Sequence, residues 1–209
     1  LNMASKLSCN GVAGFILANG ALSADGTEGA IRRKMIERGL VEAIIILPNN
    51  LFYSTDISVT LWILNANKKA RVVTRNGEEI HYRDREHEIL FMDLRRRGIP
   101  FEKKYVQFSP ETIEEVANVY HNWQREGHTE SYADIPEFCY SASLEEVAGK
   151  GYSLVPSKYI EFANNDETVD YETKMSALQS ELADILKEEA DSRAELLDVF
   201  KTLGYEIDL

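Results

Sequence analysis

Two adjacent aromatic residues, Phe52 and Tyr53, stand in a short polar loop between two apolar runs of the sequence, and Thr55 follows in the same loop. Large rings beside the end of a strand are costly to leave in water unless they pack against something. One interpretation makes them core residues of a covered hairpin or crossover. The other makes them part of a functional surface. The sequence pattern leaves both open.

The second feature that could serve a function is a basic segment. Residues 68–104 hold 11 lysines and arginines against 7 acidic residues, whereas residues 161–209 hold 14 acidic against 4 basic residues in a chain of net charge −12. A nucleic acid must be met by basic side chains, because released counterions supply much of the affinity. The acidic C-terminal quarter therefore cannot be such a surface. The basic segment either is one or is a solvated face; the candidates for DNA-backbone contact are Arg95, Arg96, Arg97, Lys103 and Lys104.

The cysteines and histidines argue against a metal site. Cys9 and Cys139 lie far apart without CxxC or CxH spacing, and the four histidines lack HxxxH spacing. We expect two reduced, buried thiols in a cytoplasmic protein. No run approaches the roughly 20 apolar residues of a membrane span, and no leader sequence opens the chain. With 209 residues, 44% of them hydrophobic and 28% charged, the chain has the composition of a globular protein of one large or two small domains.

The elements that would position these residues begin with a strand–helix–strand pattern. Residues 12–18 and 41–47 are apolar runs that predict buried strands, and residues 28–37 between them predict a helix capped by Thr27. This spacing predicts a right-handed crossover between parallel strands. Residues 57–65 follow too soon for a crossover helix, so we expect them to form an antiparallel strand at the edge of the sheet.

The remaining elements up to residue 169 are shorter. Asn76-Gly77 predicts a hairpin with a type I′ turn, residues 88–93 a strand, and Ser109 followed by Pro110 the start of a helix over residues 111–125. The later predicted elements are a strand at 135–141, a helix at 143–150 capped by Ser143, and a polar hinge at 159–169.

The C-terminal region predicts an amphipathic helix of about 30 residues, on the order of 45 Å long. Its apolar residues recur in steps of three and four, with one slip of phase, at Met175, Leu178, Leu182, Ile185, Leu197, Phe200 and Leu203. A helix of this length needs a cover for such a stripe, because helix propensity alone does not bury leucine and phenylalanine. The cover is either the chain's own domain or the helix of a partner.

Motifs over nearly the whole chain resemble the modification subunit, the DNA adenine methylase, of type I restriction-modification systems. The loop, Leu47-Pro48 followed by Leu51-Phe52-Tyr53-Ser54-Thr55-Asp56-Ile57, is similar to the family's LP, two variable residues, LFYxTxI. Five other segments also resemble family motifs: Gly14-Phe15-Ile16-Leu17-Ala18-Asn19-Gly20, Glu28-Gly29-Ala30-Ile31-Arg32, Phe91-Met92-Asp93, Lys103-Lys104 with Ser109-Pro110-Glu111-Thr112-Ile113, and Gly151 to Tyr159. Each is weak alone, but their order is that of the family.

The resemblance implies an α/β fold, namely the C-terminal part of a methylase-type sheet with parallel strands plus an antiparallel edge strand. A helical C-terminal region with a long amphipathic helix would follow. The implied divisions are residues 1–98 as the C-terminal half of an S-adenosylmethionine-dependent methylase domain, 99–165 as a mainly helical extension, and 166–209 as the long helix.

Two family elements are absent from this sequence. The glycine-rich turn for S-adenosylmethionine does not occur, and the five prolines are never adjacent, so the family's Asn-Pro-Pro-Phe tetrapeptide is missing. In the family both elements precede the matching region. The resemblance therefore implies a C-terminal piece that contains no catalytic residue and is inactive alone, with S-adenosylmethionine bound by the missing N-terminal part.

The resemblance also implies roles for the candidate residues. Phe52, Tyr53 and Thr55 would wall the pocket for a flipped adenine, and the C-terminal helix would contact the specificity subunit, which sets the DNA sequence recognised. A second modification subunit and the restriction subunit would complete the DNA-bound complex. The alternative is a helical assembly module that binds a partner subunit and has no catalytic role.

Overall fold

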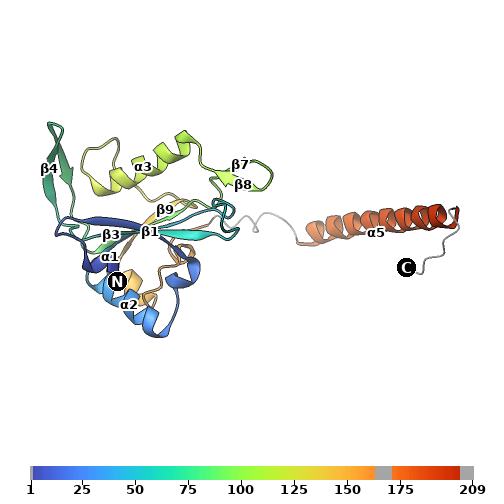
Figure 1. The fold of residues 1–209 in the computed structure, drawn as a ribbon, viewed down its shortest axis with the longest axis horizontal. Coiled ribbons are helices and arrows are strands. Elements are labelled where there is room, and N and C mark those ends of the chain that lie inside the picture. The colour runs from blue at the N-terminus through green and yellow to red at the C-terminus, as the bar shows by residue number, and fades with distance from the viewer. Residues whose placement is uncertain (1, 163–170, 203–209) are drawn as a thin grey trace. The chain divides into compact units, whose positions relative to one another are not determined.

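The computed structural model describes residues 2–162 and 171–202, and the chain divides into two compact units, Leu1–Ala163 and Asn164–Leu209 (Figure 1). A boundary at residue 98 would fall inside the first unit. No helix within the described residues has both the length and the apolar character needed to cross a membrane.

The first unit is built on a five-stranded sheet of order β1-β3-β2-β6-β9. Its strands are β1 (Val12–Ala18), β2 (Val41–Ile46), β3 (Val59–Asn65), β6 (Glu88–Asp93) and β9 (Cys139–Ser143). Strand β2 is parallel to β6, and the other neighbouring pairs are antiparallel. This is the mixed α/β sheet that the sequence predicts.

The position of β3 corrects one detail of the prediction. The strand is antiparallel to β2, as its short connection requires, but it lies between β1 and β2 rather than at the edge. Strands β1 and β2 therefore run in the same direction without being neighbours. A short connection fixes the relative direction of two strands, whereas the order across the sheet depends on long-range pairing.

Helices cover both faces of the sheet (Figure 1). Helix α2 (Gly26–Glu37) and helix α4 (Leu144–Gly149) pack on one face, and helix α3 (Pro110–Gln124) packs on the other. Side chains of the central strands alternate between the two sides, so that Ile89 and Phe91 join the first cluster while Leu90 and Met92 join the second. Such burial on both faces explains the continuous apolar runs in the sequence.

Two local predictions of burial are wrong. Strand β1 exists but is mostly exposed, with Val12 and Ile16 among its exposed side chains, because among the described residues only β3 pairs with it. Cys9 is exposed, whereas Cys139 is buried as expected, and both thiols are free. Helix α2 also begins earlier than predicted, and its N-cap is Asp25 instead of Thr27.

Several turn and capping predictions are confirmed. Asn76 and Gly77 both have positive φ, as a type I′ turn requires, between β4 (Arg71–Arg75) and β5 (Glu78–Tyr82). The hydroxyl of Ser109 accepts a hydrogen bond from the backbone N–H of Thr112 at the start of α3. Ser143 caps α4 in the same way. The other short elements are α1 (Asn2–Ser5), η1 (Asn19–Leu22), β7 (Ile99–Phe101), β8 (Tyr105–Gln107) and η2 (Pro156–Lys158).

The predicted hinge begins too early. Tyr159 and Ile160 are buried in the core, and the ring of Tyr159 stacks on Phe91 with the ring centroids 4.1 Å apart. The polar composition of this region led to the hinge prediction, but the buried ring of Tyr159 packs the end of the first unit against the sheet. Residues 163–169 of the predicted hinge lie outside the described residues.

The second unit contains α5 (Tyr171–Thr202), a helix of 32 residues that matches the predicted length. Its apolar side chains are exposed from Met175 to Leu197, and Phe200 is half-buried. Leu203, also predicted in the stripe, lies outside the described residues. Within the second unit by itself, the described apolar side chains of the stripe from Met175 to Leu197 are therefore exposed.

Candidate functional site

The candidate site lies at one edge of the sheet. Strands β1, β2 and β6 run in the same direction, so their carboxyl ends reach the same edge. The backbone N–H of Leu94, just after β6, donates a hydrogen bond to the carbonyl of Ile46 at the end of β2, over 2.9 Å. In α/β sheets, ligands bind beyond the carboxyl ends of the strands. The loop with the aromatic pair and the arginines after β6 both start from this edge.

The loop between β2 and β3 is closed by its own hydrogen bonds. Asn50 has a φ of 57°, a left-handed conformation that asparagine tolerates. Its backbone N–H donates to the carbonyl of Asp56 over 3.3 Å, and the hydroxyl of Ser58 donates to the carbonyl of Leu47 over 2.6 Å. The loop thus has a defined shape that fixes where its aromatic residues point.

The two aromatic residues of this loop have different environments. Phe52 is half-buried and packs against the hydrophobic cluster beneath α3, which matches the core interpretation. Tyr53 is 72% exposed, which leaves its ring available to a ligand. Thr55 is half-buried, and its hydroxyl accepts a hydrogen bond from the N–H of Ile57, so it braces the loop. The structure separates a pair that the sequence treats as equivalent.

An aromatic groove of about 270 Å³ lies beside Tyr53. Its other walls come from the β7–β8 hairpin and the start of α3, and its lining residues are Leu51, Tyr53, Phe101, Tyr105, Val106, Gln107, Phe108 and Ile113. The rings of Tyr53 and Tyr105 meet edge to face with centroids 4.7 Å apart. Sequence reasoning missed Tyr105. The spacing Phe101-Glu102-Lys103-Lys104-Tyr105, a tight turn between two aromatic residues, was the available signal.

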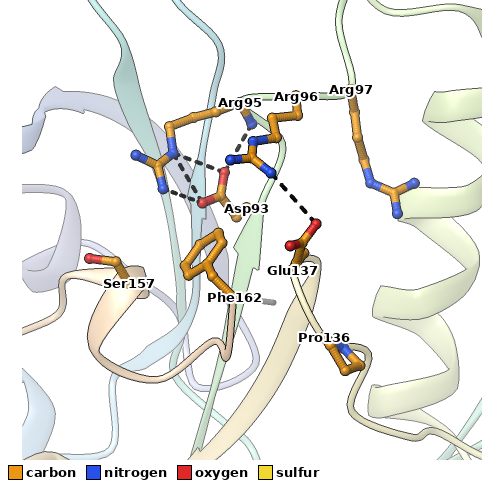
Figure 2. A pocket seen from close by; sticks show the side chains of 8 residues that line it. All are labelled: Asp93, Arg95, Arg96, Arg97, Pro136, Glu137, Ser157 and Phe162. Carbon is orange, nitrogen blue, oxygen red and sulfur yellow. Dashed lines mark hydrogen bonds and ion pairs between the residues drawn. The ribbon is translucent and has the colours of Figure 1, made fainter. Parts of the chain in front are cut away.

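A second cavity, of about 640 Å³, opens beyond the end of β6 (Figure 2). Its lining residues are Asp93, Arg95, Arg96, Arg97, Pro136, Glu137, Ser157 and Phe162. Figure 2 shows Arg95 beside Asp93 and Arg96 extended toward Glu137, while Arg97 lies apart from them. All three consecutive arginines therefore line this cavity, and Arg95 and Arg96 each pair with an acidic residue of its lining.

Most of the predicted DNA-contacting cations have acidic partners in the chain. Arg95 donates to both oxygens of the buried Asp93, at 2.6 Å for the shortest contact, and this hydrogen bonding raises the pKa of Arg95. Arg97 pairs with Glu115 of α3. Lys104 pairs with Asp56 over 3.1 Å. Arg96 forms a longer contact of 3.6 Å with Glu137 and is mostly exposed.

Lys103 lies in the turn between β7 and β8, where it is exposed. Arg96 and Lys103 are therefore exposed members of the predicted set.

Two other cations of the basic segment are buried, so the segment as a whole is not a solvated face. Lys68 and Arg85 are buried in a polar network centred on the carboxylate of Glu42, which lies at the start of β2 and away from the candidate site. Arg85 and Gln124 donate to one oxygen of Glu42, and Asn65 and Tyr120 donate to the other. A buried charge is costly unless it is paired and hydrogen-bonded. These contacts therefore stabilise the folded first unit.

Neither a metal nor S-adenosylmethionine has an evident site among the described residues. No group of three or more His, Cys, Asp or Glu residues in this part of the chain is arranged to hold a metal ion. A cradle for the cofactor would need glycines where a strand turns into a helix, with close backbone approach. After β1 there is one such glycine, Gly20, and the glycine-rich pattern itself does not occur there.

Comparisons with known proteins agree with the sequence motifs. The family model described as N-6 DNA Methylase matches residues 1–168. The methylase subunit of the type I restriction enzyme HindI from Haemophilus influenzae is 34% identical over 207 residues, which cover 98% of this chain and 43% of that protein. The MjaIX methylase subunit from Methanocaldococcus jannaschii is 30% identical over 200 residues, covering 94% of this chain and 33% of that protein. This chain thus spans well under half the length of these relatives.

Solved structures support the fold. The methyltransferase subunit of a type I restriction-modification system from Streptococcus thermophilus superposes with a TM-score of 0.60 at 26% identity, covering 76% of this chain and 28% of that one. The M protein of the type I restriction enzyme EcoKI gives a TM-score of 0.51 at 16% identity, and it covers 90% of this chain and 44% of that one. The mixed sheet of the first unit is therefore the arrangement found in these proteins.

Proposed function

The chain belongs to the N-6 DNA methylase family, and we propose that it is the C-terminal part of the methylase subunit of a type I restriction-modification system. In this proposal the whole protein transfers a methyl group from S-adenosylmethionine to N6 of adenine in DNA, and this chain is inactive alone. The observation that carries the proposal is the family match over residues 1–168. The same proposal places the complex with DNA in the cytoplasm.

The loop between β2 and β3 would form one wall of the pocket for the target adenine. The amino group of adenine is inaccessible inside the duplex, so an enzyme that modifies it must extrude the base. Stacking on an aromatic side chain offsets part of the lost pairing and stacking energy. Tyr53 supports this role because its ring is 72% exposed at the carboxyl edge of the sheet. Phe52 and Thr55 would then hold the loop in place.

The DNA backbone would be met by cations near the same edge. Arg96 and Lys103 are exposed, so they can bind phosphates directly. Arg95, Arg97 and Lys104 have acidic partners, and they would orient the surface rather than bind phosphates alone. Contacts to phosphates fix the orientation of a protein on the duplex, and the other subunits would supply more of them.

The cofactor and the catalytic residues would come from another part of the protein. The family's glycine-rich turn for S-adenosylmethionine does not occur in this sequence, and in the family this element precedes the matching region. The methyl donor would therefore be bound N-terminal to this chain, and the residues described here would hold the acceptor base and the partners.

The long helix α5 would bind the specificity subunit. Its apolar side chains are exposed, and a continuous stripe of this kind is the contact surface of a helix–helix interface. A second methylase subunit and the restriction subunit would join the same complex. These partners fit a chain whose relatives are named as subunits of type I restriction enzymes.

The test is a methylation assay with the full-length protein that carries this chain, purified with its specificity subunit. We expect transfer of a labelled methyl group to N6 of adenine in DNA containing the recognition site. Replacing the target adenine by 7-deazaadenine, which keeps the amino group, should preserve transfer, whereas replacing it by purine, which lacks the amino group, should abolish it. A complex that binds the specificity subunit and never methylates DNA would contradict the proposal.

That last outcome would favour a second candidate function, a helical assembly module without a catalytic role. The exposed stripe of α5 is the observation that supports it. The two functions differ in the effect of Tyr53→Ala, which should reduce methylation under the first and leave assembly unchanged under both.

A further inference from the structure

We propose that the β7–β8 hairpin is the second wall of the base-binding groove, and that its Tyr105 is a positioning residue that holds the ring of Tyr53 for stacking on the extruded base. The inference rests on the proposed function and deepens it. The observation behind it is that the groove is shared between the loop after β2 and the hairpin, two segments about 50 residues apart in the sequence.

The hairpin is fixed against the loop by backbone contacts. The N–H of Val106 in β8 donates a hydrogen bond to the carbonyl of Asn50 over 3.0 Å. Gly98 allows this approach, because a Cβ at that position would lie 2.1 Å from a methyl group of Val106 and 3.4 Å from the ring of Pro48. Glycine is therefore required at this point, and the two segments are held at one spacing.

An ion pair between the side chains adds to this connection. Lys104 in the hairpin turn donates to Asp56 of the loop over 3.1 Å, and its amino group lies 5.2 Å from the centre of the Tyr105 ring. The hairpin thus contacts the loop on both sides of Tyr53, at Asn50 and at Asp56.

The ring of Tyr53 has one aromatic neighbour that limits its rotation. Tyr105 is half-buried and meets it edge to face, with an interplanar angle of 71°. An edge-to-face pair prefers a particular relative orientation, so a fixed Tyr105 favours one orientation of Tyr53. One face of the mostly exposed Tyr53 ring is then ordered before the ligand arrives, which reduces the entropy lost on binding.

The occupant that suits this groove is a nucleobase still attached to its DNA strand. Every nucleobase, whatever its identity, has a flat aromatic face that can stack on a ring. The exposed Lys103 at the hairpin turn gives the neighbouring surface the positive charge that the adjoining phosphates require.

The test uses the full-length methylase in complex with its specificity subunit, with wild type compared with Tyr105→Ala, Tyr105→Phe, Tyr53→Ala and the double variant Tyr53→Ala/Tyr105→Ala. We expect Tyr105→Ala to lower kcat/KM for DNA methylation by about threefold to tenfold. Tyr105→Phe keeps the edge contact and should stay within about twofold of wild type. Because Tyr105 acts through Tyr53, the double variant should be no worse than Tyr53→Ala.

A spectroscopic measurement separates positioning from folding. In DNA with 2-aminopurine at the target position, an extruded base fluoresces strongly, and stacking on tyrosine quenches it. We expect higher fluorescence with both Tyr53→Ala and Tyr105→Ala than with wild type, and a wild-type signal with Tyr105→Phe. Thermal unfolding of each variant checks that the complex stays folded.

Two outcomes would overturn the inference while the proposed function stands. The first is full activity and unchanged fluorescence with Tyr105→Ala. The second is a double variant whose loss equals the product of the two single losses, since Tyr105 would then act independently of Tyr53. A wild-type complex that fails to methylate DNA would overturn the proposed function, and this inference with it.

Discussion

Glu42 and Arg85 form an ion pair in which neither side chain is exposed to solvent, with 3.2 Å between the carboxylate and the guanidinium. The pair joins the start of β2 to the segment before β6, and Gln124 and Tyr120 extend it to α3. Burial lowers the pKa of Arg85, and the nearby carboxylate of Glu42 opposes that shift. The network therefore connects the sheet to the helix that covers one of its faces.

Removing the charge of Glu42 should destabilise the first unit strongly. Glu42→Gln leaves the buried guanidinium of Arg85 without its counter-charge, so the free energy of unfolding should fall by about 3–5 kcal/mol. Urea unfolding followed by the fluorescence of Trp62 and Trp123 measures this, because both tryptophans lie in the first unit. Glu37→Gln is the matched control: its ion pair with Arg33 is exposed, and stability should hardly change. If Glu42→Gln lowers the free energy of unfolding as little as Glu37→Gln does, the buried network does not contribute to stability.

Lys68 should make stability depend on pH in the alkaline range. Burial lowers the pKa of Lys68 to about 8, and its ammonium donates to the carbonyls of Val41 and Glu88. Below pH 8 the lysine is protonated in both the folded and the unfolded chain. The free energy of unfolding is then reduced by the full cost of burying its charge. Between pH 8 and its ordinary pKa of about 10.4 the unfolded chain binds more protons, so the free energy of unfolding rises with pH.

The measurement compares wild type with Lys68→Met by urea unfolding at pH 7 and pH 9.5. From the first pH to the second, the stability of wild type relative to the variant should increase by about 2 kcal/mol. The difference removes the contributions of other titrating groups that both proteins share. A constant difference across this range would show that the pKa of Lys68 is not lowered by burial.

Phe52 and Tyr53 should separate stability from activity. Phe52→Ala removes a half-buried ring, so it should lower the free energy of unfolding by about 1–2 kcal/mol and reduce methylation through the loop. Tyr53→Ala should leave unfolding nearly unchanged and lower kcat/KM in the full-length complex by roughly 5- to 150-fold, the equivalent of one stacked base. Association with the specificity subunit should be intact in both. Full activity with Tyr53→Ala would remove this ring from the base-binding site.

Local sequence signals predicted turns and helix starts well. The order of the strands and the burial of charged residues depend on long-range pairing, which these signals do not contain. Ser109 with Pro110 and Asn76 with Gly77 specify a helix start and a turn through their own backbone preferences, and both occur as predicted. The insertion of β3 between β1 and β2 has no local signal, because either order buries the same apolar residues. The burial of Lys68 and Arg85 was missed for the same reason. Glu42, an acid inside an apolar strand, was the visible hint of a buried partner.

The sequence named residues of the candidate site but not their surroundings. The loop of Phe52 and Tyr53 lies at the carboxyl edge of the sheet, and the sequence could not distinguish its half-buried ring from its exposed one. Tyr105 approaches Tyr53 only because a hairpin folds back on the loop at Gly98. Ion pairs such as Arg97 with Glu115 join residues on different elements and cannot be read from a count of charges.

The isolated chain should not bind S-adenosylmethionine. The family's glycine-rich turn is absent from this sequence, and the proposal assigns the cofactor to an N-terminal part of the protein. Isothermal titration calorimetry of residues 1–209 should show no saturable heat, while the full-length protein serves as the positive control. Clear binding by the isolated chain at micromolar cofactor would contradict the assignment.

The stripe of α5 should be necessary for binding the specificity subunit. Leu182 and Ile185 lie in this stripe and are 56% and 55% exposed, so a partner helix can bury them. Each such side chain contributes on the order of 1.5–3 kcal/mol when fully buried. Losing several of them would dissociate a complex of micromolar affinity, which corresponds to about 8 kcal/mol. Deleting residues 164–209 should therefore abolish co-purification with the specificity subunit and leave the first unit folded, since that unit is compact by itself.

A finer variant keeps the helix and changes only the stripe. Leu182→Asp with Ile185→Asp should abolish association, because both charges would enter the interface. Ser176→Asp with Ser180→Asp is the matched control: it adds the same charge within about one turn, on the face opposite to Leu182 and Ile185 in a helix with 3.6 residues per turn. Circular dichroism should show equal helix content in the two double variants. If the stripe variant still binds the specificity subunit with wild-type affinity, the partner does not cover α5, and the helix must have another role.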